Sequence, residues 1–96
     1  MKTRKTSGNV FADLGFDADE AENLRIRAML MAEAERFIRR NGLSQAEAAA
    51  RMGVRQPRIS DLVRGKIGVF SVDTLIAMLA AVGLKVSVRV VRTRAA

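Results

Sequence analysis

The stretch Leu43–Lys66, LSQAEAAARMGVRQPRISDLVRGK, decides how this chain folds. Its pattern predicts two short helices joined by a tight turn. Ser44 and Glu47 have the spacing of a capping box, in which the serine hydroxyl and the glutamate carboxylate each accept a backbone N–H at the helix start. Gly53 follows the last residue of this first helix, Met52, where a positive φ is expected.

The second helix of the pair is expected from Arg55 to Arg64. Pro57 is acceptable because it lies in the first turn, where its missing N–H has no partner within the helix. A plain helical hairpin is the alternative. The coincidence of capping box, glycine turn, early proline and polar outer face favours a unit that presents its second helix to a partner. The apolar residues of this helix recur at spacings of three and four and predict its buried stripe: Ile59, Leu62 and Val63.

Helices are also predicted on both sides of this unit. Residues 17–40 form a long one, with acids at its start and arginines at its end, as the helix dipole favours. Ser71 is expected to cap a further helix that runs to Val82 and turns Leu75, Ile76 and Leu79 inward.

Residues 84–92 change period and predict a β-strand. Val86, Val88 and Val90 alternate with polar residues and would form one apolar face. Since a lone strand needs a partner, the same strand of a second copy is expected to pair with it across a two-fold axis. The alternative is packing against the chain's own N-terminal arm.

Residues 1–16 are expected to be a flexible arm, and residues 93–96 a short tail. The apolar residues of the arm are unusual for a solubility tail. It therefore either packs back onto its own domain or binds a partner.

The charge of the chain, +7 over 96 residues, is unevenly distributed. Residues 17–41 carry six acidic and five basic side chains, whereas residues 42–70 and 71–96 each carry a net charge of +3. This basic excess at the paired helices and beyond them points to a polyanionic partner.

Catalysis and membrane insertion are not supported by the composition. The sequence has no histidine and no cysteine, and its acidic residues form no evident cluster, so no enzyme activity, metal or cofactor is expected. The N-terminus lacks the apolar core of a signal peptide, and no apolar run approaches the ~20 residues of a membrane span. A cytoplasmic location is therefore expected.

The outer face of the second helix suits the major groove of DNA. Glutamine can pair with adenine, arginine with guanine, and aspartate with cytosine, while proline can touch a thymine methyl group. The residues expected to contact bases are Gln56, Pro57, Arg58, Ser60 and Asp61. Those expected to contact phosphates, at helix starts and just past helix ends, are Ser44, Gln45, Arg55, Arg64 and Lys66. A solvated surface charge is the alternative for each basic residue.

Residues 25–83 resemble the helix-turn-helix domains of the Xre and phage Cro/repressor class. The resemblance rests on the LSQAE motif from Leu43 and on Ala50, Gly53-Val54, Gln56, Ile59, Leu62 and Gly65-Lys66. It implies a mainly all-α, lambda-repressor-like fold of four to five helices over residues 17–83, with the strand at 84–92 for dimerisation. One departure is Arg55, since such domains usually have Ser or Thr there as the cap of the second helix.

The flanks also resemble the antitoxins of HigBA/RelBE-like toxin–antitoxin pairs. The resemblance rests on SGNVFADLGF from Ser7, on the acidic start of the long helix and on the terminal valine strand. It implies a homodimer that represses its own operon and binds a RelE/HigB-like toxin. By motif, the toxin contacts would be Asn9, Val10, Phe11, Leu14 and Phe16.

The sequence thus predicts a DNA-binding transcriptional repressor that acts as an antitoxin on a double-stranded DNA operator. Two alternatives stay open. The protein is either a solitary Xre-type regulator without a toxin, or mainly a toxin neutraliser with weak DNA binding.

Overall fold

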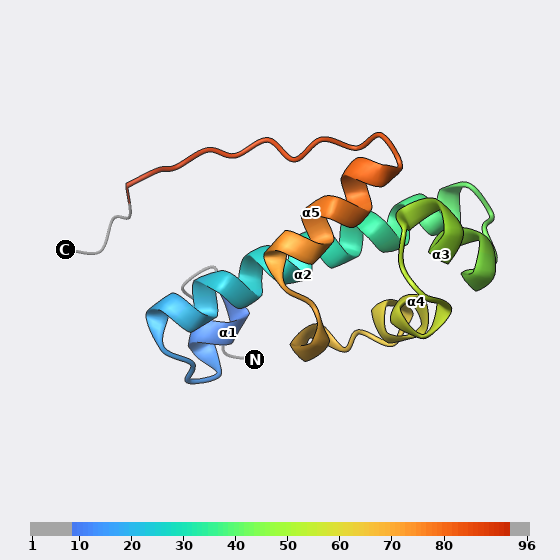
Figure 1. Cartoon of the computed structure of the whole chain (residues 1–96). Coiled ribbons are helices and arrows are strands. Elements are labelled where there is room, and N and C mark those ends of the chain that lie inside the picture. Colours follow the sequence, from blue (N-terminus) through green and yellow to red (C-terminus); the bar gives the residue numbers. More distant parts are fainter. Residues whose placement is uncertain (1–8, 93–96) are drawn as a thin grey trace, which may run out of the picture.

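Helix α2 (Ala18–Arg40) is the longest element of the computed structural model, which describes residues 9–92. Helices α1 (Val10–Asp13) and α5 (Val72–Ala81) pack directly on it, as Figure 1 shows. Helices α3 (Gln45–Met52) and α4 (Gln56–Val63) pack on each other near its C-terminal end. A short 3₁₀ helix, η1 (Ile67–Val69), links α4 to α5.

The long helix predicted over residues 17–40 is confirmed. Asp17 occupies the N-cap position, acidic residues occupy the first turn, and Arg39 and Arg40 the last, where the helix dipole favours each charge. Its apolar residues recur at spacings of three and four, and one of them, Ala28, is only half-buried. The buried residues of α2 are Ala21, Leu24, Leu30, Met31, Ala34 and Ile38.

The core lies where α2, α3, α4 and α5 meet. The predicted cap of α5 is confirmed, because the Ser71 hydroxyl accepts a hydrogen bond from the Thr74 backbone N–H. Two predicted core residues are wrong. Val63, the last residue of α4, is exposed. Ile76 is exposed on α5, and Met78 is buried there instead. The largest fully buried side chains are Phe70, Ile59, Leu75 and Met78.

The predicted C-terminal β-strand is wrong for the single chain. Residues 9–92 contain no strand, and residues 84–92 run as an extended segment back past α5 (Figure 1). A strand exists only when its backbone groups bond to a neighbouring strand. The described part of the N-terminal arm cannot be that neighbour, because residues 10–13 are helical and lie on α2.

The arm itself divides at residue 9. Its first eight residues lie outside the described part of the chain, whereas residues 9–16 form α1 and the turn that leads into α2. In this structure the described half of the arm therefore packs onto its own domain.

Candidate nucleic-acid interface

The start of α3 is fixed by the predicted capping box. The Ser44 Oγ accepts a hydrogen bond from the Glu47 N–H at 3.1 Å, and the Glu47 Oε1 accepts one from the Ser44 N–H at 2.9 Å. The hydrogen bond from the Ser44 backbone N–H is the main cause that lowers the pKa of the Glu47 carboxyl below its ordinary value. Gly53 then ends the helix with φ 72°, the left-handed conformation predicted for it.

Helix α4 presents one face to the core and the opposite face to solvent. Ile59 and Leu62 are 0% and 3% exposed, which sets the rotation of the helix. Pro57 lies in the first turn as predicted. No side chain caps the helix start at Arg55, so the predicted loss of the cap is confirmed.

The outward face of α4 lies beside the start of α3. Gln45, at the first position of α3, lines an open hollow of about 350 Å³ together with Gln56, Pro57 and Ser60. Three of the five residues expected to contact bases therefore share one surface with a residue expected to contact phosphate. A duplex that placed its major groove over α4 would meet all four.

The other two residues expected to contact bases lie on a second flank of α4. Arg58 Nη1 and Asp61 Oδ2 form an ion pair at 3.4 Å, and the Arg58 guanidinium lies over the Phe70 ring, 5.8 Å from its centroid. The spacing of three between Arg58 and Asp61 could have indicated the pair from the sequence. The Phe70 contact could not have been found this way, because nothing local relates that residue to Arg58.

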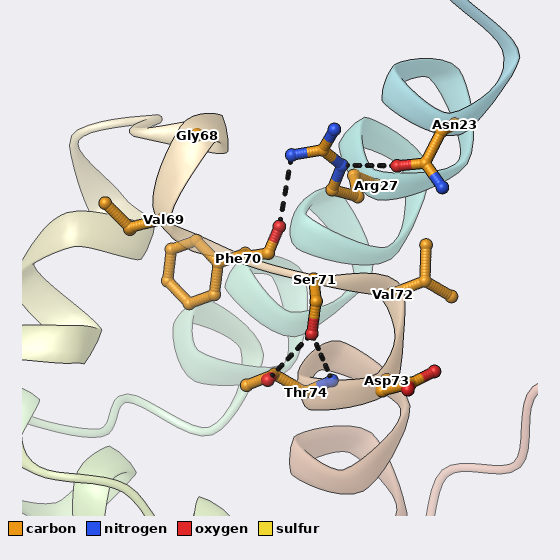
Figure 2. A pocket seen from close by; sticks show the side chains of 9 residues that line it. All are labelled: Asn23, Arg27, Gly68, Val69, Phe70, Ser71, Val72, Asp73 and Thr74. Carbon is orange, nitrogen blue, oxygen red and sulfur yellow. Dashed lines mark hydrogen bonds between the residues drawn. The ribbon is translucent and has the colours of Figure 1, made fainter. Parts of the chain in front are cut away.

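The segment that follows α4 is held by an arginine that the sequence did not single out. Arg27 Nη1 of α2 donates hydrogen bonds to the Ile67 and Phe70 carbonyl oxygens at 3.1 and 3.2 Å. Its Nε donates to Asn23 Oδ1 at 2.7 Å. Arg27 lines a hollow of about 600 Å³. Figure 2 shows it across from Ser71 and Thr74 at the capped start of α5.

The remaining residues expected to contact phosphates are exposed around these helices. Arg55 lies at the start of α4, Arg64 at its end, and Lys66 in the turn before η1. Ser44 is exposed too, and its oxygen serves the capping box. The basic side chains thus flank α4 at both ends.

The five residues expected to contact a toxin divide into two sets. Asn9 caps α1 and its Nδ2 donates to the Ala21 carbonyl oxygen at 3.1 Å, while Phe11 is half-buried and packs edge-on against Phe16. Val10 and Leu14 are 60% and 70% exposed. Asn9 thus ties α1 to α2, whereas Val10, Leu14 and Phe16 are exposed.

The valines expected at a dimer interface become more exposed along the C-terminal segment. Val86 is half-buried, whereas Val88 and Val90 are 78% and 92% exposed. Val86 and Val88 also line a hollow against α5, beside Ile76. The part of the chain that the structure describes thus leaves an apolar edge uncovered here.

Two further features concern other kinds of site. Residues 9–92 hold no group of three His, Cys, Asp or Glu side chains that could bind a metal ion. Among the described helices, none combines the length and apolar character that crossing a bilayer requires.

Comparison with known proteins places these features in a family. The model of a helix-turn-helix domain family matches residues 10–91. One solved structure, of a protein described as a candidate XRE-family transcriptional regulator, superposes with a TM-score of 0.71 at 34% identity. The match covers 79% of this chain and 85% of that one. No curated protein sequence matches significantly.

Proposed function

The chain belongs to this helix-turn-helix domain family, and we propose that it is a sequence-specific DNA-binding repressor of transcription. The observation that carries the proposal is the exposed face of α4, where Gln56, Pro57 and Ser60 lie beside Gln45. The family match and the similarity to a protein described as a candidate XRE-family transcriptional regulator support DNA-binding regulation. Repression follows if the operator overlaps a promoter.

In this function α4 enters the major groove and reads base edges. Gln56 pairs with adenine, Arg58 with guanine, and Pro57 and Ser60 contact neighbouring bases. Arg55, Arg64 and Lys66 neutralise phosphates on both sides of the groove, and Gln45 and the exposed start of α3 at Ser44 hydrogen-bond to phosphate oxygens. Affinity should therefore fall steeply as salt concentration rises.

The test is a gel shift on DNA from upstream of the protein's own coding region. The double variant Gln56→Ala, Arg58→Ala should bind the operator at least about 100-fold more weakly, because two base contacts are lost. Arg25→Ala, on α2 and away from α4, removes one positive charge and serves as the control. Specific binding that survives in the double variant would rule out α4 as the reading helix.

The repressor works as a homodimer in this proposal. The support is the uncovered C-terminal segment, whose Val86, Val88 and Val90 alternate with polar side chains. A second copy of the segment, running antiparallel, would supply the missing backbone hydrogen bonds and cover the valines. Two α4 helices would then face half-sites about 34 Å apart.

A second function is neutralisation of a RelE/HigB-like toxin through α1. The observation in its favour is the exposed apolar set Val10, Leu14 and Phe16, which Asn9 holds in place on α2. Large apolar side chains that are exposed next to one another mark binding surfaces. A solitary regulator without a toxin is the competing assignment.

Co-purification with the product of the neighbouring reading frame separates these assignments. Val10→Ser together with Leu14→Ser should abolish capture of a toxin and leave operator binding unchanged, since both side chains are already exposed. Met29→Ser, an exposed apolar residue of α2, is the control. A neighbouring frame that encodes no partner, or unchanged capture by the variant, would favour the solitary regulator.

A further inference from the structure

The Arg58 side chain of α4 is contacted by two other side chains. Its guanidinium contacts the Asp61 carboxylate at 3.4 Å and lies 5.8 Å from the centroid of the Phe70 ring. The side chain remains 43% exposed, so it can still reach a ligand. An arginine in open solvent would sample many rotamers, whereas these two contacts restrict it to one region beside α4.

Asp61 is an unexpected residue at a surface that binds DNA. It is the only acidic residue from Ala48 to Val72, a range that contains five basic residues. Its carboxylate repels phosphate, and a half-exposed ion pair with a spacing of three adds little to stability. The Arg58–Asp61 ion pair is therefore better explained by its effect on the position of Arg58 than by stability.

The Phe70 side of the contact is rigid. The ring is 2% exposed within the core, and the Phe70 carbonyl oxygen is held by Arg27 of α2 (Figure 2). The position of the ring relative to α4 is thus set by the packing of the domain. The aromatic face gives the guanidinium a fixed surface, and the carboxylate fixes its direction.

We propose that Asp61 is a specificity-determining positioning residue, which orients Arg58 to read one guanine in each half-site and does not itself contact a base. This inference rests on the proposed DNA-binding function. It reassigns Asp61, which the sequence alone suggests as a reader of cytosine. The Asp61 carboxylate also keeps Arg58 from pairing with phosphates indiscriminately, which lowers binding to non-specific DNA.

Two consequences distinguish a positioning role from direct reading. If Asp61 acts through Arg58, removal of either side chain relaxes the preference at the same base pair. If Asp61 reads a base directly, each removal relaxes a different base pair. The base pair at which discrimination is lost, rather than the size of the loss, therefore distinguishes the two roles.

The experiment selects binding sites from a random duplex library and then measures affinity for every single-base-pair variant of the selected site. Wild type, Asp61→Asn, Arg58→Ala and the double variant are compared. Asp61→Asn should lower discrimination at one G·C pair about tenfold. Arg58→Ala should lose discrimination at that same pair, and the double variant should be no worse than Arg58→Ala alone. Affinity of Asp61→Asn for non-specific duplex should rise.

Asp73→Asn, in the first turn of α5, removes the same charge and is the matched control. It should leave discrimination at every base pair unchanged. Phe70→Leu keeps the site apolar but removes the ring, and should weaken discrimination at the same pair as Asp61→Asn. Because Phe70 is buried, the Phe70→Leu result is used only if the circular dichroism spectrum and melting temperature of this variant match those of the wild type. The Asp61 and Arg58 variants are sufficient to test the proposal without it.

Two results would overturn the inference. One is a changed preference at a second base pair in Asp61→Asn that Arg58→Ala does not affect, which would make Asp61 a direct reader. The other is an unchanged preference in Asp61→Asn. If the wild type selects no sequence at all, the proposed DNA-binding function fails instead, and the two failures are thus distinguishable.

Discussion

The α3–α4 unit and the C-terminal segment 84–92 are both rich in apolar residues, yet only the first is complete within one chain. In α3 and α4 the apolar side chains Ala48, Met52, Ile59 and Leu62 are buried in the common core. In the C-terminal segment, Val88 and Val90 face solvent. A helix satisfies its backbone hydrogen bonds locally, whereas a strand depends on a neighbour.

The two regions should therefore respond to different changes. The α3–α4 unit should depend on packing inside the chain and be insensitive to protein concentration. The C-terminal segment should contribute little to the fold of one copy and much to the association of two.

The largest effect is expected from Ile59→Ala, which opens a cavity in the middle of the core. Ile59 is 0% exposed, and truncation of such a residue costs about 2–5 kcal/mol of unfolding free energy. Urea denaturation followed by circular dichroism measures the loss. Val63→Ala, on the same helix but 44% exposed, is the control and should cost about 1 kcal/mol or less. Equal losses in the two variants would mean that α4 is not anchored as described.

The next effect concerns the other region. Val88→Lys together with Val90→Lys should leave the helical circular dichroism signal unchanged and convert the protein to a monomer in light scattering. Affinity for a two-half-site operator should then fall about 100-fold, because the second half-site is no longer bound in the same complex. Ser87→Lys, on the polar face of the segment, is the control. A dimer that persists in the double variant would place the interface elsewhere.

The same contrast explains how far the sequence alone could lead. The capping box of Ser44 and Glu47, the turn at Gly53 and the early Pro57 are local signals, and each was predicted. The strand prediction was wrong for the single chain because alternating valines indicate a preference for extended backbone and do not supply a neighbouring strand. The spacing of Val63 and Ile76 predicts that they are buried, but both are exposed. Spacing gives the apolar face of a helix and does not show how far the neighbouring helices cover that face.

The candidate site divides in the same way. The outer polar face of α4 could be listed from helix periodicity. The clamp of Arg27 on the Phe70 carbonyl joins residues 43 positions apart, and the contact of Arg58 with the Phe70 ring also depends on how α2, α4 and η1 pack. Such contacts are set by tertiary structure, which no local pattern in one sequence encodes.

A smaller effect is expected at the turn between α3 and α4. Gly53 has φ 72°, and an added Cβ would meet nothing within 4 Å. Gly53→Ala should therefore cost only the backbone strain of a left-handed residue, about 1 kcal/mol. Thermal melting measures it, and Gly68→Ala, where φ is not left-handed and the space is also open, is the control. A loss of several kcal/mol would imply a tighter α3–α4 contact than the structure has.

The smallest effect should appear with pH at the start of α3. Hydrogen bonds from Ser44 lower the pKa of Glu47 below its ordinary value of 4.5, so the ionised carboxylate is the form that the fold favours. Its contribution to stability is present above pH 4.5 and is lost as the pH falls through the lowered pKa. The melting temperature of Glu47→Gln should thus be below that of the wild type at pH 7, and the difference should become smaller in acid. Glu20→Gln, an exposed acid in the first turn of α2, is the control for general charge effects. If the difference in melting temperature stayed constant from pH 7 into acid, the capping box would stabilise α3 without the charge of Glu47. The α3–α4 unit would then be held by packing and hydrogen-bond geometry alone.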